Sequence, residues 1–246
     1  MESELLKISK EDFEKNKTLV HIVDNEEQNN FINDLEDNPN AFLLACIMDR
    51  QTHAEKVWAI PYKIYKKFGT FDIEFLANIP LNDYEKLFKE ESYHRYNNIM
   101  PKVFYEGVNK IKNDYDGDGS KIWSDNPSSA SVVSRLLEFH GVGLKIATMT
   151  ANILVRQFDV PMSDTYSIDI SPDVHVKRIF VRLGYLQEKP SDLQVMYKAR
   201  EINPEYPGII DHTCWTIGRE YCHKKNPECN SCPLNIECKY YKRLNK

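Results

Sequence analysis

Four of the six cysteines lie within 17 residues near the end of the chain, in the spacing C-x6-C-x2-C-x5-C. They are Cys222, Cys229, Cys232 and Cys238. Thiolates gathered this closely repel one another unless a cation neutralises them, so the spacing indicates a metal site. Zinc usually takes two C-x2-C pairs and only one is present, whereas a single compact loop suits a [4Fe–4S] cluster. The spacing is compatible with a zinc ion and with an iron–sulfur cluster, and it favours the cluster.

Cations surround this cysteine loop although the formal net charge is −5. Residues 1–40 hold 11 acids and 4 lysines, which leaves 26 acids against 28 bases in the remaining 206 residues. His223, Lys224 and Lys225 lie between the first two cysteines. A locally basic loop on a mildly acidic protein fits contact with a phosphate backbone, and a solvated charged tail is the alternative.

A second motif, within residues 131–147, predicts a helix, a tight turn and another helix. Gly141 and Gly143 frame a single valine, and glycines at both corners let two helices cross closely. They also leave backbone N–H groups pointing outward at the start of the second helix, which suits one DNA phosphate. A simple helix–helix corner is the alternative. Lys145 follows two residues after the turn.

Asp173 precedes an amphipathic segment and stands where an N-cap is expected. A carboxylate held at a helix N-terminus stays ionised, which is what stabilising a developing sugar cation requires. Asp169 is a rival for that role. An acidic loop at residues 114–125 imitates a calcium loop, but Asp125 replaces the required glutamate, so we expect a solvated loop there.

The elements that must position these residues are helices. Apolar residues recur at three-to-four spacing and strand-like alternation is hard to find, so the predicted fold class is all-α. The predicted helical segments are 41–48, 55–68, 98–111, 131–139, 144–155, 174–183 and 209–221. The proline-bounded stretch 161–172 is the expected boundary between a central and a C-terminal domain.

The composition limits the class of protein. Apolar residues make up 41% and charged residues 28% of 246 residues, so wholesale disorder and fibrous repeats are excluded. No apolar run reaches about 18 residues, and the first four residues lack the features of a signal peptide. We therefore expect a soluble, cytoplasmic protein that is not secreted and has no membrane partner.

Taken together, these segments resemble the endonuclease III family of helix-hairpin-helix DNA glycosylases. The resemblance rests on residues 139–147, on Asp173-Val174-His175 and on the four-cysteine loop. Residues 42–58 look like the family's first barrel helices, with Gln51 at the position of its DNA-inserting glutamine. Tyr96-Asn97 is similar to its next minor-groove loop.

The resemblance implies base excision repair of double-stranded DNA by a nucleoid-associated monomer that removes a damaged or modified base and then nicks the strand by β-elimination. It matches Lys145 to the Schiff-base lysine and favours Asp173 over Asp169 as the catalytic aspartate. The four cysteines match the ligands of a [4Fe–4S] cluster. The DNA-contacting positions would be Gln51, Gly141, Gly143, His175, Lys224 and Lys225.

The resemblance also implies two helical lobes with a DNA cleft between them. Residues 41–158 would form the central domain with the hairpin, and 1–40 with 159–246 the cluster domain. Two departures stand out: His140 replaces the hairpin's usual proline, and a longer stretch than usual separates Lys145 from Asp173. Base specificity therefore stays open. The alternatives are a glycosylase without lyase activity, one for an unusual base, and a non-catalytic iron–sulfur DNA-binding protein.

Overall fold

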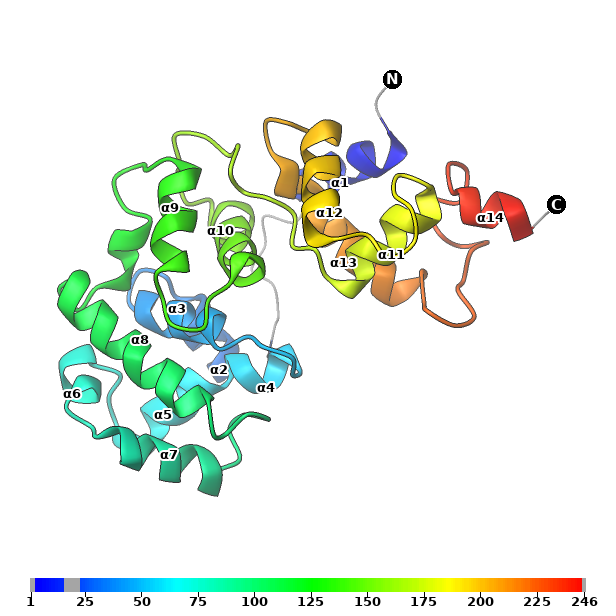
Figure 1. The fold of residues 1–246 in the computed structure, drawn as a ribbon. Helices are drawn as coiled ribbons and strands as arrows, with labels where there is room; N and C mark the ends of the chain where they lie inside the picture. Colours follow the sequence, from blue (N-terminus) through cyan, green and yellow to red (C-terminus); the bar gives the residue numbers. More distant parts are fainter. Residues whose placement is uncertain (1–2, 16–22, 245–246) are drawn as a thin grey trace. The chain divides into compact units, whose positions relative to one another are not determined.

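The computed structural model describes residues 3–15 and 23–244 (Figure 1). Every regular element within these residues is helical and none is a strand, so the predicted all-α fold class is confirmed. Residues 1–2, 16–22 and 245–246, which fall in the predicted terminal domain, lie outside the described residues. Among the helices described, none has the length and apolar character needed to cross a bilayer.

The chain divides into two compact units. Unit 1 comprises residues 1–18, 128–133 and 151–246, and unit 2 comprises residues 19–127 and 134–150. The hairpin turn lies in unit 2, because that unit includes the end of α9 (Ser129–Leu137) and the start of α10 (Leu144–Phe158).

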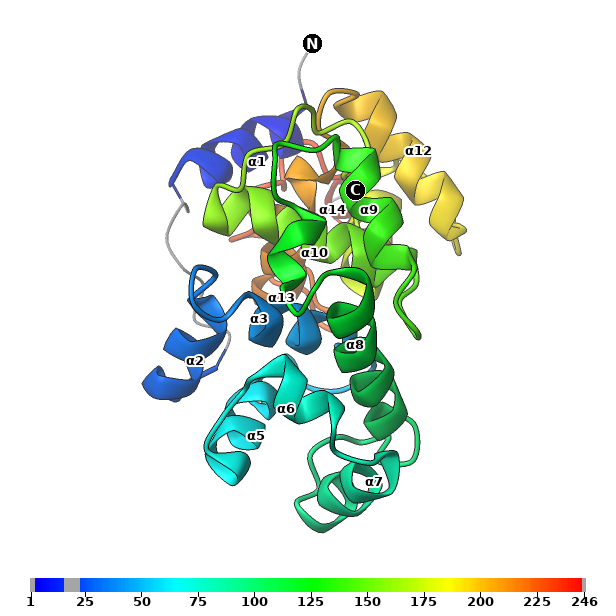
Figure 2. The ribbon, with the colours of Figure 1, turned by 90° about the vertical axis from the view of Figure 1, so that its left-hand side faces the viewer.

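Unit 2 is built around the helix α3, whose apolar residues from Ala41 on are buried. Its elements, besides parts of α9 and α10, are α2 (Glu26–Asn33), α3 (Pro39–Ile47), α4 (Ala54–Trp58), α5 (Ile60–Phe68), α6 (Ile73–Ala77), α7 (Leu81–Glu90), α8 (Met100–Asp114) and the 3₁₀ turn η1 (Gly119–Ile122). Residues 41–48 are all completely buried, as expected for a helix that is apolar on every side. Around it pack α2, α5 and α8, while α6 and α7 lie against α8 (Figure 2).

Close packing of α3 on α8 depends on Gly107. A Cβ at this position would lie 2.6 Å from Ile47 Cδ1 and 3.0 Å from Leu44 Cδ2. The η1 turn is fixed to α3 by Asn40, whose side chain donates to Gly117 O at 2.9 Å and accepts from Gly119 N at 2.7 Å. The loop at residues 114–125 is thus held by protein hydrogen bonds.

The helix predicted over residues 55–68 is wrong as a single element. It forms two helices, α4 and α5, that meet at Ala59. Pro61 lies in the first turn of α5, where its missing N–H costs nothing, but it removes the hydrogen bond that would continue α4.

Unit 1 is held together by the packing of α11 on α13. Its elements are α1 (Glu4–Lys15), α11 (Val174–Leu183), α12 (Asp192–Ile202), the 3₁₀ turn η2 (Pro207–Ile210), α13 (Asp211–Glu220) and α14 (Lys239–Leu244). Gly218 on α13 meets the His175 side chain, so a Cβ there would lie 2.6 Å from its Cβ atom. From the other side, α1 packs on α13 and η2, and Asp12 contacts His212 at 2.7 Å.

Candidate active site

Of the two glycines that frame the hairpin turn, one adopts a backbone conformation that favours glycine and the other does not. Gly141 is left-handed, with φ of +82°, a conformation that side chains disfavour. Gly143 has no such φ, and the space beside it is open. His140, which replaces the usual proline, places its Nδ1 3.1 Å from Glu106 Oε2 on α8. A polar contact with a neighbouring helix therefore supports the turn where a proline ring would stiffen it.

Lys145 lies on the first turn of α10 and is exposed. Ala147 N donates to Gly143 O at 3.1 Å, so α10 begins directly at the turn. An exposed side chain on the first turn after the hairpin leaves the Lys145 amine accessible to a ligand bound at the turn.

Gln51 is held in an unusual backbone conformation beside the start of α8. Its φ is +45°, in the left-handed region, and its Oε1 accepts a hydrogen bond from Tyr96 OH at 2.6 Å. A cavity of about 210 Å³ adjoins this pair and is lined by Arg50, Gln51, Tyr96, Ile99 and Met100. The structure therefore joins Gln51 and Tyr96, which the sequence placed 45 residues apart, at one surface of unit 2.

In unit 1, Asp173 is the N-cap of α11, as predicted. One carboxylate oxygen, Oδ1, accepts from both His175 N and Val176 N at 2.8 Å. The cap fixes the orientation of the carboxylate through Oδ1. Val174, the first residue of the helix, is 69% exposed, so this end of α11 borders solvent in unit 1.

His175 lies against the rest of unit 1. Its Nδ1 is 2.9 Å from Arg178 Nη2, and Arg178 also donates to Gly218 O at 2.9 Å. Because the Arg178 guanidinium donates, Nδ1 is the acceptor and the proton of a neutral ring lies on Nε2. The contact with DNA predicted for His175 stays a prediction beside this packing role.

Asp169 is a structural residue in this fold. Both of its carboxylate oxygens are taken by the guanidinium of Arg200, at 2.8 Å from Nε and 2.7 Å from Nη2. Among the described residues, Asp173 has no such bidentate partner. The stretch that separates Lys145 from Asp173 is thus fixed to α12, and the geometry favours Asp173 over its rival.

Sequence reasoning missed two carboxyl groups near these residues. Asp211, at the start of α13, lies near Asp173. Removal from water raises the pKa of the Asp211 carboxyl to about 7, and the charge of Asp173 adds to that rise. Asp49, which follows α3, lies near Lys145. An isolated acid at a helix end carries no signal in a sequence, because the group it meets comes from a distant segment.

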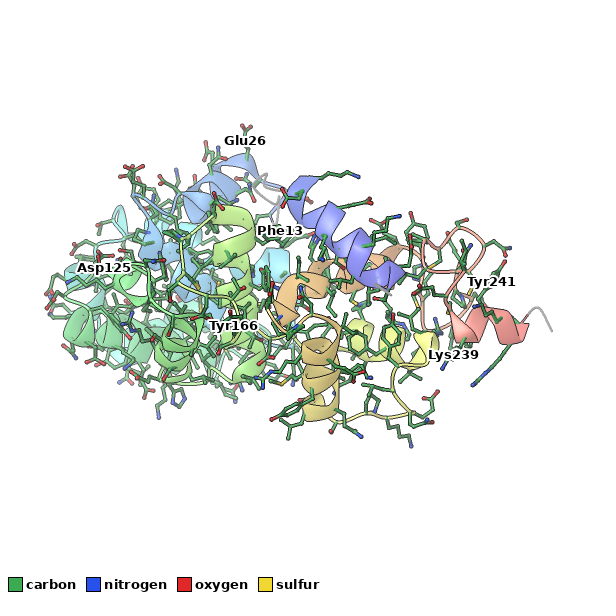
Figure 3. All side chains as sticks on the ribbon, turned by 90° about the horizontal axis from the view of Figure 1, so that it is seen from above. Phe13, Glu26, Asp125, Tyr166, Lys239 and Tyr241 are labelled. Carbon is green, nitrogen blue, oxygen red and sulfur yellow. The ribbon has the colours of Figure 1, made fainter. Side chains whose placement is uncertain are left out.

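The cysteine loop is tied to α11 by Arg182. Its Nη1 lies 3.1 Å from Cys222 Sγ and donates to His223 O at 2.8 Å. On α14, Tyr241 donates to Asn230 Oδ1 at 2.8 Å, and Figure 3 shows Tyr241 and Lys239 beside this loop. Lys224 and Lys225 are exposed. The loop backbone is thus held while its cations face solvent.

The four cysteines of the loop are free thiols and lie near one another. Burial raises the pKa of the Cys229 and Cys232 thiols, and the charges of neighbouring cysteines add to the rise in both. Across residues 3–15 and 23–244, no three Cys, His, Asp or Glu side chains are arranged to hold a metal ion.

Comparison with known proteins shows similarity to endonuclease III in both sequence and structure. Endonuclease III of Thermotoga maritima is 26% identical over 216 residues, which cover 87% of this chain and 89% of that protein. The structure of a non-covalent endonuclease III–DNA complex superposes with a TM-score of 0.61 and 25% identity, over 84% of this chain and 87% of that one. The chain is similar in sequence and in fold to endonuclease III-like helix-hairpin-helix DNA glycosylases. No protein-family model matches it.

This endonuclease III-like chain also resembles part of much longer plant proteins. Protein ROS1A of Oryza sativa subsp. japonica is 27% identical over 163 residues, which cover 59% of this chain. The chain spans only 8% of the length of ROS1A and 14% of that of DEMETER-like protein 3 of Arabidopsis thaliana. The similarity is thus confined to one segment of these relatives.

Proposed function

We propose that this chain is a base excision DNA glycosylase with an associated AP lyase activity on double-stranded DNA. The observation that carries the proposal is the position of Lys145, exposed on the first turn of α10 directly after a glycine turn. Endonuclease III relatives, and the name of one plant relative, DNA glycosylase/AP lyase ROS1, support the same chemistry. The damaged or modified base is extruded from the helix, because its glycosidic bond is inaccessible in the stack.

Two side chains have separate roles in the proposed reaction. The neutral amine of Lys145 forms a bond to C1′ as the base leaves with the electrons of the glycosidic bond. The Asp173 carboxylate, oriented by its cap, stabilises the positive charge that develops on the sugar. The bound nitrogen then loses a proton, the C1′–O4′ bond breaks and O4′ takes up a proton, so the sugar ring opens to an iminium at C1′. This iminium allows loss of a C2′ proton and departure of the 3′ phosphate, which nicks the strand.

Duplex binding is assigned to three surfaces. Backbone N–H groups at Gly141 and Gly143 hold one phosphate, and Lys224 and Lys225 neutralise others. Gln51, held by Tyr96, fills the space that the extruded base leaves. We assign His175 to the same DNA-contacting set on the motif alone.

We further propose that the cysteine loop holds a [4Fe–4S] cluster. Its ligands would be Cys222, Cys229, Cys232 and Cys238, which lie on one loop fixed by Arg182. When bound, the cluster neutralises the thiolates and stabilises the loop that carries Lys224 and Lys225.

Borohydride trapping tests the proposed activity. The wild-type chain should form a covalent complex with a duplex that contains an abasic site, and Lys145→Gln should form none. Lys66→Gln, at an exposed lysine of α5, is the matched control and should trap as the wild type does. If the wild type fails to trap, or if Lys145→Gln traps fully, the assignment is wrong.

A further inference from the structure

The backbone of Gln51 is anchored to the buried end of α3. Residues 41–48 are completely buried, and Arg50 N donates to Met48 O at 2.8 Å. With φ of +45°, Gln51 has a left-handed backbone, which residues other than glycine seldom adopt and which the surrounding structure must hold. Its side chain is exposed. The turn thus fixes where the Gln51 side chain starts but not the direction of its amide.

Tyr96 has an anchor of its own, in the turn before α8. Its N–H donates to His94 Nδ1 at 2.9 Å, and its carbonyl accepts from Ile99 N at 3.0 Å and from Met100 N at 2.9 Å. The His94 side chain is itself buried. Three hydrogen bonds therefore hold the backbone of Tyr96 without any contribution from Gln51.

The hydrogen bond between these two side chains fixes the direction of the Gln51 amide. Tyr96 OH lies 2.6 Å from Gln51 Oε1, which is typical of an O–H···O bond and shorter than the usual N–H···O distance of about 2.9–3.0 Å. The hydroxyl therefore donates to the carbonyl end of the amide, and the amino end, which carries two N–H donors, lies on the other side. A glutamine amide without such a partner can make a half turn and exchange its two ends.

The amide adjoins a cavity that a flat group can enter. At about 210 Å³, this cavity is smaller than the roughly 300–1,000 Å³ of sites for drug-sized ligands, so it has room for the edge of one base. Besides Gln51 and Tyr96, its lining includes Ile99 and Met100. Ile99 is apolar and yet 43% exposed, which suits contact with the face of a base.

Adenine and guanine present opposite patterns to an amide. On the edge that forms base pairs, adenine has a donor at N6 beside an acceptor at N1, whereas guanine has an acceptor at O6 beside a donor at N1. An amide that is free to turn satisfies either purine. An amide that is held in one direction satisfies one of them and leaves polar groups unpaired against the other, which is costly.

We propose that Tyr96 is a positioning residue that holds the Gln51 amide in one direction and so makes the chain distinguish adenine from guanine opposite the extruded base. The inference rests on the proposed function, in which Gln51 fills the space that this base leaves. Tyr96 acts through Gln51. Its hydroxyl therefore affects selectivity only while the amide is present.

The test is the affinity for two duplexes that carry a stable abasic-site analogue and differ only in having adenine or guanine opposite it. The wild-type chain should bind one of them at least about 10-fold more tightly, because the fixed amide leaves polar groups unpaired against the other. Tyr96→Phe frees the amide, so this variant should bind the disfavoured duplex more tightly than the wild type does. The ratio of the two affinities should fall to about 2 or less.

A double variant separates positioning from direct contact. In a chain that carries Gln51→Ala, the further change Tyr96→Phe should alter neither affinity, since the amide on which Tyr96 acts is gone. Tyr65→Phe, the same loss of a hydroxyl at an exposed tyrosine of α5, is the matched control and should keep the wild-type ratio.

Three results would each overturn the inference: equal wild-type affinities for the two duplexes, an unchanged ratio in Tyr96→Phe, or a further change in the double variant. Borohydride trapping by the wild type on an abasic duplex would then still support the proposed function. Absence of trapping in the wild type removes the proposed function and this inference together.

Discussion

Asp169 and Arg200 form a bidentate ion pair, with distances of 2.8 and 2.7 Å between the guanidinium donors and the carboxylate oxygens. The Asp169 side chain is 4% exposed and that of Arg200 is 40% exposed. The pair connects the stretch before α11 to α12. Arg200 also stacks on Tyr197, with 5.2 Å between the guanidinium carbon and the ring centroid. The neighbouring acids Asp169 and Asp173 thus differ in their partners: Asp169 pairs with a guanidinium, whereas Asp173 caps a helix.

Amide substitution should separate these tasks. Asp173→Asn should lower base release by about 10²-fold while the chain stays folded, because the cap oxygen remains but the charge is lost. Asp169→Asn should instead cost about 1–3 kcal/mol of stability, since a hydrogen-bonded charge pair is broken, and leave base release nearly intact. Single-turnover base release and thermal unfolding measure the two effects. Loss of base release in Asp169→Asn alone would reverse the assignment.

The cysteine loop should contain iron. The purified protein should be yellow-brown with about four irons per chain, because four thiolates on one loop match a cubane cluster. Cys229→Ser should lose both the colour and the iron. Cys214→Ala is the matched control, because Cys214 is completely buried on α13 outside the loop, and it should keep them. Stoichiometric zinc without a visible absorption band would contradict the assignment.

Charge reversal at Lys224 and Lys225 should weaken binding to all duplexes alike. Both are exposed on a loop whose backbone Arg182 holds, so we expect them to bind phosphates and to read no base. The plot of log affinity against log salt should become less steep by about 2, one for each phosphate that a lysine no longer neutralises. The same double reversal at Lys86 and Lys89, exposed on α7, is the control. Unchanged affinity and slope would mean that the loop does not face DNA.

Periodicity predicted several helices but missed others, among them α1, α7 and α12. The segment predicted over 174–183 matches α11 residue for residue, because an N-cap and a C-terminal glycine bound it. By contrast, α6 has five residues, too few for a helical repeat to be visible. The sequence analysis treated residues 1–40 only as an acidic segment and did not predict α1, whose buried face includes Leu5 and Leu6.

Motifs located the residues to which we assign the chemistry but not the residues around them. Lys145, Asp173 and Gln51 each belong to a spacing that a sequence shows. Asp49 does not, because Lys145 lies 96 positions further along the chain. Long-range proximity of this kind depends on tertiary packing, which no local pattern encodes.

Asp211 makes the stability of unit 1 depend on pH. Removal from water, and then the Asp173 charge, raise its pKa from 3.8 to about 7, while Arg156 opposes the rise. Below about pH 4 the carboxyl is protonated in both folded and unfolded chains and contributes nothing. Between pH 4 and 7 the unfolded chain releases the proton and the folded chain keeps it, so stability falls across this window. Above pH 7 the loss is constant.

Asp211→Asn removes this penalty because an amide does not ionise. The variant should therefore gain stability relative to the wild type as the pH rises from 4 to 7, by about 1.4 kcal/mol for each unit of raised pKa, and the gain should level off above pH 7. Urea unfolding at a series of pH values measures the difference, in which the contributions of Asp12, His212 and Arg156 largely cancel. For Glu188→Gln, at an exposed acid of unit 1, the difference in stability from the wild type should not change with pH. A difference between Asp211→Asn and the wild type that does not change over the window would show that this carboxyl is already ionised in the folded protein.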